Sequence, residues 1–268
     1  MRLVETDLES GARVLVGIPV YNEQKYVAPV LHEVRRYARD ILVIDDGSTD
    51  CTPMRLAEQP VEVVRHATNR GYGRSMQDML RWAKFDGFDW LITMDCDEQH
   101  EPAAIPRFME RIAADQSDII SGSRYLMPSP DDSAPPTDRR QINMQITEEI
   151  NERLGLSLTD AFCGFKAYRV SACDRLALDV DGYDFPMQCW VQAVARGLAI
   201  EEIPVRLIYN DPSRTFGGPL DDPQNRLNVY RRTMHRELRR CHELLPAVAV
   251  SGLGRCLVGE CGGKSAAV

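Results

Sequence analysis

Residues 41–50 read ILVIDDGSTD, in which an apolar run ends at two acids, a glycine and three further polar residues. An apolar run this short, bounded by turn residues, predicts a strand that is buried on both faces. Gly47 predicts a turn, and Ser48 or Thr49 is suited to cap a following helix. Similar runs alternate with helical patterns on both sides. The sequence therefore predicts an α/β fold with a mainly parallel sheet and helices on both of its faces.

The predicted elements alternate along the chain. The predicted strands are residues 14–20, 41–45, 61–66, 90–95, 118–124 and 198–209. The predicted helices are residues 24–38, 50–58, 73–85, 102–115, 140–154 and 186–196. From about residue 126 to 139 the chain is rich in Pro, Ser and Asp, which predicts a long loop that is either a lid or a simple connector.

The segment from Asn225 to Leu245 has apolar residues every three or four positions and six arginines among the others. This spacing predicts one amphipathic helix. Such a helix either rests on an anionic membrane surface or packs on the domain with its basic face in water. We favour packing on the domain.

Composition excludes several classes of protein. The chain has 268 residues, of which 44% are apolar and 27% are charged, as in a globular protein with a large core. A net charge of −8 argues against a surface that coats nucleic acid. No stretch approaches the ~20 apolar residues of a transmembrane helix, and no secretion signal is recognisable. Eight cysteines without zinc-site spacing indicate a reduced, cytoplasmic protein.

Polar residues follow the first four predicted strands at Pro19–Glu23, Asp45–Asp50, Asn69–Gly73 and Asp95–Asp97. In open parallel sheets, ligands bind at the carboxyl ends of the strands. These segments, three of them acidic, therefore converge at one edge of the predicted sheet. The convergence predicts a site for a hard cation and a polar ligand.

The segment MDCDEQH at 94–100 places Asp95 and Asp97 two residues apart at a strand end. Paired carboxylates there suit Mg²⁺ or Mn²⁺, which take oxygen ligands and often bridge to a diphosphate. A calcium loop of the EF-hand type is excluded, since His100 and Pro106 occupy the positions that need Gly and Glu. The alternative is that both aspartates are turn and cap residues.

Other nucleotide and hydrolase motifs are absent from the sequence. In NRGYGRSM at 69–76, Met76 stands where a dinucleotide fingerprint has its third glycine. The chain has no GxxxxGK[ST] and no GxSxG, and its five histidines are scattered. These observations argue against a P-loop enzyme and against a Ser–His hydrolase.

An ordered set of motifs resembles glycosyltransferase family 2, with its GT-A fold. The motifs are IPVYNE (18–23), VIDDGSTD (43–50), NRGYG (69–73), DCD (95–97), SGSRY (121–125) and DAFCGFKAYR (160–169). Within the family, the likeness is greatest to dolichol-phosphate or polyprenyl-phosphate mannosyl- and glucosyltransferases. The resemblance implies a GT-A domain at 14–215, with a nucleotide-binding half at 14–124 and an acceptor half at 125–215. An extension at 1–13 precedes it, and a helical segment with a tail at 216–268 follows it.

The resemblance also implies roles for single residues. It implies that the nucleotide-sugar contacts are Pro19, Tyr21, Glu23, Asp45, Asp46, Arg70, Asp95 and Arg214. Asp95, Asp97 and Gln99 would hold the Mg²⁺ or Mn²⁺. Arg124 and Asp160 would be the catalytic residues, with Arg124 near phosphate or acceptor and Asp160 near the acceptor. Related enzymes invert the anomeric centre by a single displacement.

Three departures from the family pattern leave the acceptor and donor open. Close relatives have Arg-x-x-Gly-x-Ser-Lys after the strand that ends near Pro204, whereas this chain has Asn210-x-x-Ser213-x-Thr215-Phe216, with Arg214 as a displaced cation. Gln188 stands where relatives often carry an acid. Many relatives also have C-terminal membrane helices, which we do not find here.

We therefore expect a metal-dependent inverting glycosyltransferase that uses a donor of the GDP-mannose or UDP-glucose type, with polyprenyl phosphate as the leading acceptor. A lipid phosphate is already anionic and needs no base, so Asp160 would then position other groups. One alternative is a saccharide or small-molecule hydroxyl as acceptor, with Asp160 taking its proton. The other is a protein that binds nucleotide-sugar without catalysis. We expect a cytoplasmic protein that contacts the inner membrane face peripherally, with no nucleic acid partner.

Overall fold

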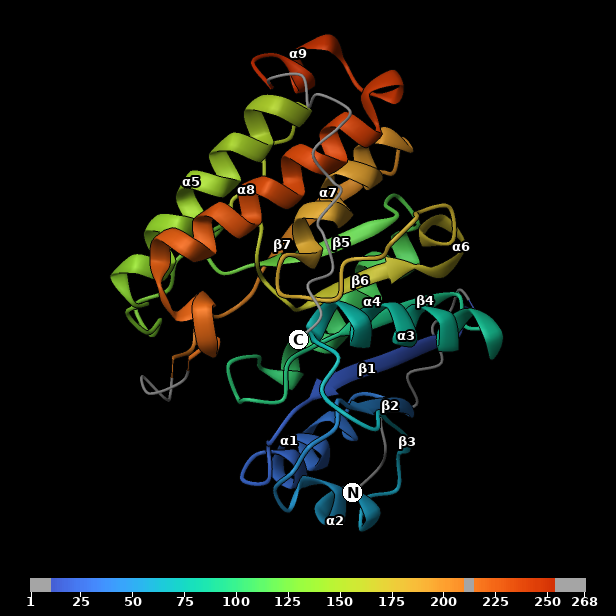
Figure 1. Ribbon diagram of the computed structural model, residues 1–268. Helices are drawn as coiled ribbons and strands as arrows, with labels where there is room; N and C mark the ends of the chain where they lie inside the picture. The colour runs from blue at the N-terminus through green and yellow to red at the C-terminus, as the bar shows by residue number, and fades with distance from the viewer. Residues whose placement is uncertain (1–10, 210–214, 254–268) are drawn as a thin grey trace, which may run out of the picture.

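The computed structural model describes residues 11–209 and 215–253, which form one seven-stranded sheet with helices on both faces (Figure 1). The strand order is β3-β2-β1-β4-β6-β5-β7. All neighbouring strands run parallel except β6, which is antiparallel to β4 and β5. The strands are β1 (Val14–Val20), β2 (Asp40–Asp45), β3 (Glu62–Arg65), β4 (Trp90–Thr93), β5 (Ile119–Ser123), β6 (Lys166–Arg169) and β7 (Ile200–Pro204). This architecture confirms the predicted α/β class.

The predicted helices occur in the predicted order, together with two short helices that were not predicted, Val170–Cys173 and Ala247–Val250. Short 3-10 turns lie at Pro102–Ala104, Gly218–Asp221 and His242–Leu244. The helices are α1 (Val27–Val34), α2 (Thr52–Ala57), α3 (Tyr72–Phe85), α4 (Ile105–Ala114), α5 (Thr137–Leu154), α6 (Val170–Cys173), α7 (Phe185–Ala195), α8 (Pro223–Arg240) and α9 (Ala247–Val250). The bounds of α3, α4, α5 and α7 lie within three residues of the prediction.

Burial on both faces explains the apolar run at 41–44. Leu42 and Ile44 pack into the core cluster beneath α3, α5, α7 and α8. Ile41 and Val43 belong to the cluster beneath α1 and α4 on the other face. Because successive side chains of a strand point to opposite faces, only a continuous apolar run can fill both cores.

Two predicted elements need correction, and one strand was missed. The strand predicted at 198–209 extends only over Ile200–Pro204, because only these residues pair with β5. The helix predicted at 24–38 begins at Val27, since the residues before it form a turn in which Tyr26 N–H and Val27 N–H donate to the Glu23 carbonyl. Strand β6 was not predicted, because KAYR is short and polar at both ends.

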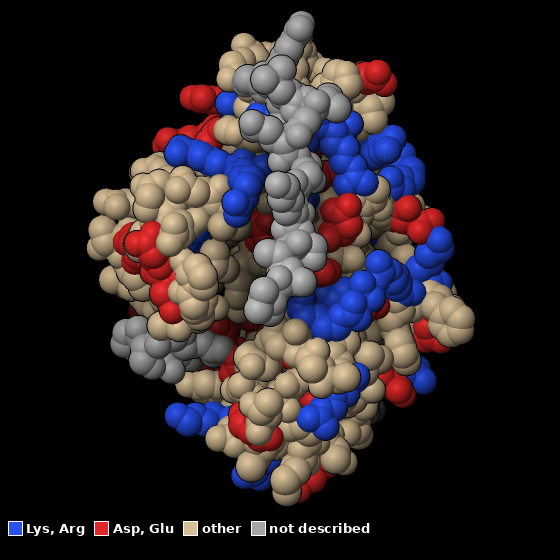
Figure 2. Space-filling model, viewed as in Figure 1, with Lys and Arg blue, Asp and Glu red and all other residues tan. Residues whose placement is uncertain are grey.

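The amphipathic tail helix packs on the domain. Its buried side chains, among them Tyr230, Met234 and Leu238, belong to the larger core cluster. Several of its arginines pair within the chain: Arg231 lies 2.9 Å from Glu149, and Arg240 lies 3.2 Å from Asp179. On the face shown in Figure 2, basic side chains lie beside acidic ones in the same way. Among the described residues, no helix has the length and apolarity that a membrane span requires.

Candidate active site

A cavity of about 550 Å³ opens where β1, β2, β4 and β5 end. Its wall combines residues that follow these strands with others from α5, α8 and the segment around Phe216. The predicted convergence of polar strand ends is therefore observed. The predicted site residues that line it are Pro19, Tyr21, Glu23, Asp46, Asp95, Asp97, Gln99 and Arg124.

Three of the predicted site residues that the structure describes lie outside the cavity wall. Asp45 is fully buried behind the wall, where it accepts a hydrogen bond from Ser48 N–H and pairs with Arg65 at 3.1 Å. The wall includes Asn69 and Gly71 but not Arg70, and Asp160 lies behind Arg124. Arg214 is outside the described residues.

The loops that follow β1 and β2 are joined through Asn22. Its backbone is left-handed (φ 57°), its N–H donates to Ser48 Oγ at 2.9 Å, and its side-chain oxygen accepts from Thr49 N–H at 2.8 Å. Gly47 also has a left-handed backbone (φ 74°), and a Cβ there would lie 2.4 Å from the Thr68 carbonyl carbon. Only glycine therefore allows the turn after β2 to touch the loop after β3.

The loop that carries Asp95 and Asp97 is held by the buried side chain of His100. The Asp95 N–H donates to His100 Nδ1 at 2.9 Å. Burial lowers the pKa of His100 to about 4, so the ring is neutral at physiological pH and Nδ1 can accept. The Gln99 N–H donates to Asp97 Oδ1 at 3.1 Å, which folds the loop back on itself.

The oxygen atoms of Asp95, Asp97 and Gln99 meet the chemical preference of Mg²⁺ or Mn²⁺. All three side chains face one cavity, and Gly164 leaves room for Asp95, since a Cβ there would lie 2.7 Å from Oδ2. Within the described ranges, no group of three or more His, Cys, Asp or Glu side chains could hold a metal ion alone. Mg²⁺ in proteins commonly relies on one or two carboxylates together with substrate phosphates. The residues therefore fit a cation that is shared with a bound diphosphate.

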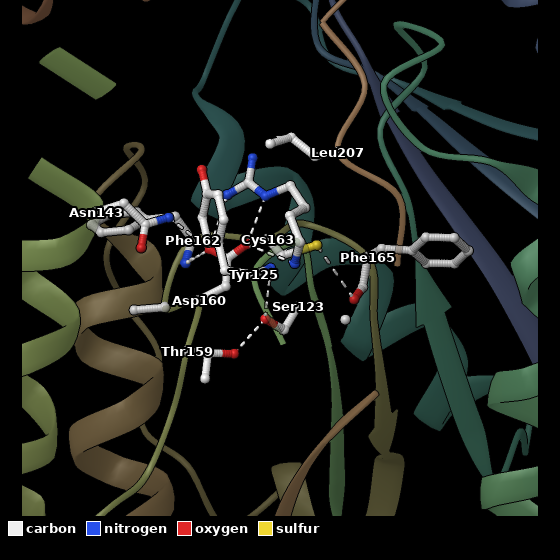
Figure 3. A network of polar contacts seen from close by, with 12 residues as sticks. Ser123, Tyr125, Asn143, Thr159, Asp160, Phe162, Cys163, Phe165 and Leu207 are labelled. Carbon is white, nitrogen blue, oxygen red and sulfur yellow. Dashed lines mark hydrogen bonds and ion pairs between the residues drawn. The ribbon is translucent and has the colours of Figure 1, made fainter. Parts of the chain in front are cut away.

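Asp160, labelled in Figure 3, forms a two-pronged ion pair with Arg124, which itself lines the cavity. The Arg124 Nε donates to Asp160 Oδ2 at 2.6 Å, and Nη2 donates to Oδ1 at 2.9 Å. Asn143 Nδ2 donates to the same carboxylate at 2.7 Å. Burial by itself raises the pKa of Asp160, but the Arg124 charge and these hydrogen bonds outweigh it and lower the pKa to about 2. Asp160 is thus ionised and fully buried, and its carboxylate oxygens accept hydrogen bonds from Arg124 and Asn143.

A residue that the sequence did not single out supports this pair. Glu202 on β7 accepts from Thr159 N–H and Oγ1–H, both at 2.8 Å, and from Asp160 N–H at 3.1 Å. It holds the segment that presents Asp160 against the edge of the sheet. Its place in the strand gave no sign of this role, because an acid in a strand is usually taken as surface-facing.

Two further arginines that sequence reasoning missed line the cavity with Arg124. Arg139 of α5 and Arg226 of α8 stack on the Phe216 ring, at 4.8 and 4.6 Å from its centroid. Arg226 also donates to Asp138 at 2.5 Å and is nearly buried. Such a cluster can bind an anionic group. The signals in the sequence were the pair of arginines at 139–140 and the arginine-rich segment 225–245, which contains Arg226.

Gln188 supports the cavity from outside its wall. Its Oε1 accepts from Asp179 N–H at 2.8 Å and from Val180 N–H at 3.0 Å. The residue is fully buried and absent from the cavity wall. This departure from the family pattern therefore concerns how the 179–180 segment is held.

Comparisons with known proteins agree with one another. The profile of the family described as Glycosyl transferase family 2 matches residues 15–177. An undecaprenyl-phosphate mannosyltransferase of Micrococcus luteus is 33% identical over 218 residues, which cover 77% of this chain and 88% of that protein. A UDP-N-acetylglucosamine–dolichyl-phosphate N-acetylglucosaminyltransferase of Methanococcus voltae is 27% identical, with 75% and 87% covered.

Among solved structures, glucosyl-3-phosphoglycerate synthase of Mycobacterium tuberculosis is similar with a TM-score of 0.65 and 18% identity, over 88% of this chain and 82% of that one. Another structure of that enzyme, with a TM-score of 0.63 and 17% identity over 88% and 80% of the chains, was solved with Mn²⁺, uridine diphosphate and phosphoglyceric acid. At this identity the likeness concerns the fold alone.

Proposed function

This chain belongs to glycosyl transferase family 2 and has the GT-A fold, and from that premise we propose that it transfers a hexose from a nucleotide-diphospho-sugar to a polyprenyl phosphate. The Arg124–Asp160 pair is the observation that supports the proposal most, because the Asp160 carboxylate is engaged and not available as a base, whereas the Arg124 guanidinium lines the cavity. The names of the Micrococcus and Methanococcus relatives point to the same class of acceptor.

The donor end is proposed to bind the nucleoside diphosphate between Pro19–Glu23 and the Asp95–Gln99 loop. Asp95, Asp97 and Gln99 would hold Mg²⁺ or Mn²⁺, which stabilises the negative charge of a leaving diphosphate when bound. Tyr21 is 45% exposed at this end, so its ring is available to a nucleotide base or ribose.

The acceptor end is proposed to bind the lipid phosphate through arginine. Arg124 lines the cavity, and the buried Asp160 fixes the plane of its guanidinium group. A planar guanidinium is suited to paired hydrogen bonds with phosphate oxygens. Arg139 adds a second guanidinium on the same wall.

The proposed reaction is a single displacement with inversion. A phosphate oxygen of the acceptor forms a bond to the anomeric carbon while the bond from that carbon to the diphosphate oxygen breaks. No proton has to leave the acceptor, which matches an Asp160 carboxylate whose oxygens are already taken up by Arg124 and Asn143. The reaction would take place at the inner membrane face, where we propose that the protein associates peripherally.

The decisive experiment uses purified full-length protein with Mn²⁺ and detergent-dispersed undecaprenyl phosphate. GDP-mannose, UDP-glucose and UDP-N-acetylglucosamine serve as separate donors, and undecaprenol, which lacks the phosphate, is the matched acceptor control. We expect one donor to give a lipid-linked sugar with the phosphate and none with the alcohol. Transfer to the alcohol or to a free saccharide would replace this proposal with a hydroxyl acceptor. Donor binding without transfer to any acceptor would favour a protein that binds nucleotide-sugar without catalysis.

A further inference from the structure

His66 follows β3 and lies between two carboxylates. Its Nδ1 is 2.6 Å from Asp46 Oδ1, and its Nε2 is 3.1 Å from Asp78 Oδ2. The imidazole is nearly buried, with 7% of the side chain exposed. An ionised carboxylate can only accept a hydrogen bond, so a His66 ring nitrogen takes part in these contacts as the donor when it carries a proton. None of the sequence motifs draws attention to this residue.

The Asp46 carboxylate holds the NRGYG loop. Its Oδ1 accepts from Arg70 N–H and its Oδ2 from Gly71 N–H, both at 2.8 Å. Neighbouring residues of this loop, Asn69 and Tyr72, line the donor half of the cavity. Asp46 thus sets where this part of the cavity wall stands.

The other carboxylate is that of Asp78 on α3, which is held by two arginines of the same helix. Asp78 accepts from Arg74 Nε at 2.8 Å and from Arg81 Nη1 at 2.7 Å. Gln77, beside it, donates to the Val180 carbonyl at 3.0 Å, and the Arg74 N–H donates to the Asp181 carbonyl. Helix α3 is therefore bound to the 180–181 segment. His66 connects this helix, through Asp78, to Asp46.

We propose that His66 is a positioning residue for the nucleotide-sugar donor. By donating to Asp46, it keeps the carboxylate aimed at the backbone N–H groups of Arg70 and Gly71, and so keeps the loop in its binding position. This role rests on the proposed function. It assigns the holding of the loop to Asp46, which also lines the cavity.

Two substitutions separate the two hydrogen bonds of His66. The amide nitrogen of Asn in His66→Asn reaches the place of Nδ1 and can still donate to Asp46. The longer Gln in His66→Gln reaches the place of Nε2 and can still donate to Asp78. We expect His66→Asn to stay within about twofold of wild type in donor affinity, and His66→Gln and His66→Ala to bind about tenfold more weakly, as the loss of one charge-assisted hydrogen bond predicts.

The measurement is the Kd of GDP-mannose, UDP-glucose and UDP-N-acetylglucosamine with Mn²⁺ by calorimetry, together with the donor KM, the acceptor KM and kcat. The donor KM should rise in His66→Gln while the acceptor KM stays unchanged. Lys84→Gln is the control, because Lys84 lies on the same helix but pairs with Asp174, outside the Asp46–His66–Asp78 network, and the donor affinity of this variant should equal that of wild type.

Equal donor affinity in all His66 variants would overturn the inference, as would equal weakening in His66→Asn and His66→Gln. If His66→Gln fails to fold, Asp46→Asn tests the same link. In this variant an NH₂ group replaces one carboxylate oxygen and can no longer accept a hydrogen bond there. The affinity for the nucleotide-sugar should therefore also fall. A wild-type protein that binds none of the three donors would overturn the proposed function as well. That outcome is distinct from donor binding that does not depend on His66.

Discussion

The Asp160 carboxylate is fully buried and accepts hydrogen bonds from Arg124 and Asn143. The motif DAFCGFKAYR favoured an acidic group near the acceptor and left open whether it takes a proton. The partner that answers this, Arg124, is 36 residues away in the chain and reaches Asp160 through β5. A carboxylate with a pKa of about 2, held by Arg124 and Asn143, suits positioning better than proton transfer.

The low pKa of Asp160 predicts a specific loss of stability in acid. Its ordinary pKa is 3.8, and in the folded protein it is about 2. The stabilisation is complete above about pH 4 and is lost as the pH falls toward 2, because the unfolded chain takes up the proton first. Across this window the free energy of unfolding should fall by about 2 kcal/mol less in Asp160→Asn than in wild type.

This prediction is checked by urea unfolding at a series of pH values. Asp131→Asn, at an exposed position, is the control and should follow the wild-type curve. Identical pH dependence in wild type and Asp160→Asn would contradict the assignment of a low pKa to this carboxyl.

Helices and strands could be predicted from the sequence where the pattern that identifies them lies within the element itself. Strands β1 and β2 were recognisable from their own apolar runs, because both faces of each are buried. Strand β6 has only four residues, and its position between β4 and β5 is decided by its neighbours. Helix α8 was predicted by its spacing, but its packing on the domain was one of two alternatives.

The turn after β2 gives a prediction at the same scale. Gly47 and Gly155 both have left-handed backbones, at φ 74° and φ 67°, but only Gly47 lies against a neighbouring segment. Gly155→Ala should cost about 1 kcal/mol of stability, from backbone conformation alone. Gly47→Ala should cost at least about 2 kcal/mol more, because its Cβ would clash with the Thr68 backbone.

Denaturant unfolding of the two variants measures the difference in their free energies of unfolding. Calorimetry with the three nucleotide-sugars measures their affinity for the site. Gly47→Ala should also weaken donor binding, since the clash displaces the loop that follows β3. Equal stability of the two variants would mean that the turn and the loop are not in close contact.

For the whole molecule, metal and donor should stabilise the fold together. A ligand at ~100 times its Kd adds about 2.7 kcal/mol to the free energy of unfolding. We expect one nucleotide-sugar to raise the melting temperature clearly with Mn²⁺ and little without it. Asp97→Asn should remove the metal-dependent part of this shift.

Thermal unfolding of wild type, Asp97→Asn and Glu98→Gln makes this comparison. Glu98 is an exposed acid beside the pair and is not part of the cavity wall, so its variant should behave as wild type. Equal shifts with and without Mn²⁺ in wild type would rule out the proposed shared cation.

The α/β class, the mainly parallel sheet and the meeting of acidic strand ends at one edge followed from the amino-acid sequence. These features depend on residue spacing within short segments and on the rule that parallel strands end on the same side. Tertiary structure alone decided that Asp45 turns inward, that Asp160 is bound by Arg124, that His66 joins Asp46 to Asp78, and that Arg139 and Arg226 share Phe216. Each of these contacts joins side chains from separate elements. Their pairing depends on distance and burial in the folded chain, which no periodicity in the sequence encodes.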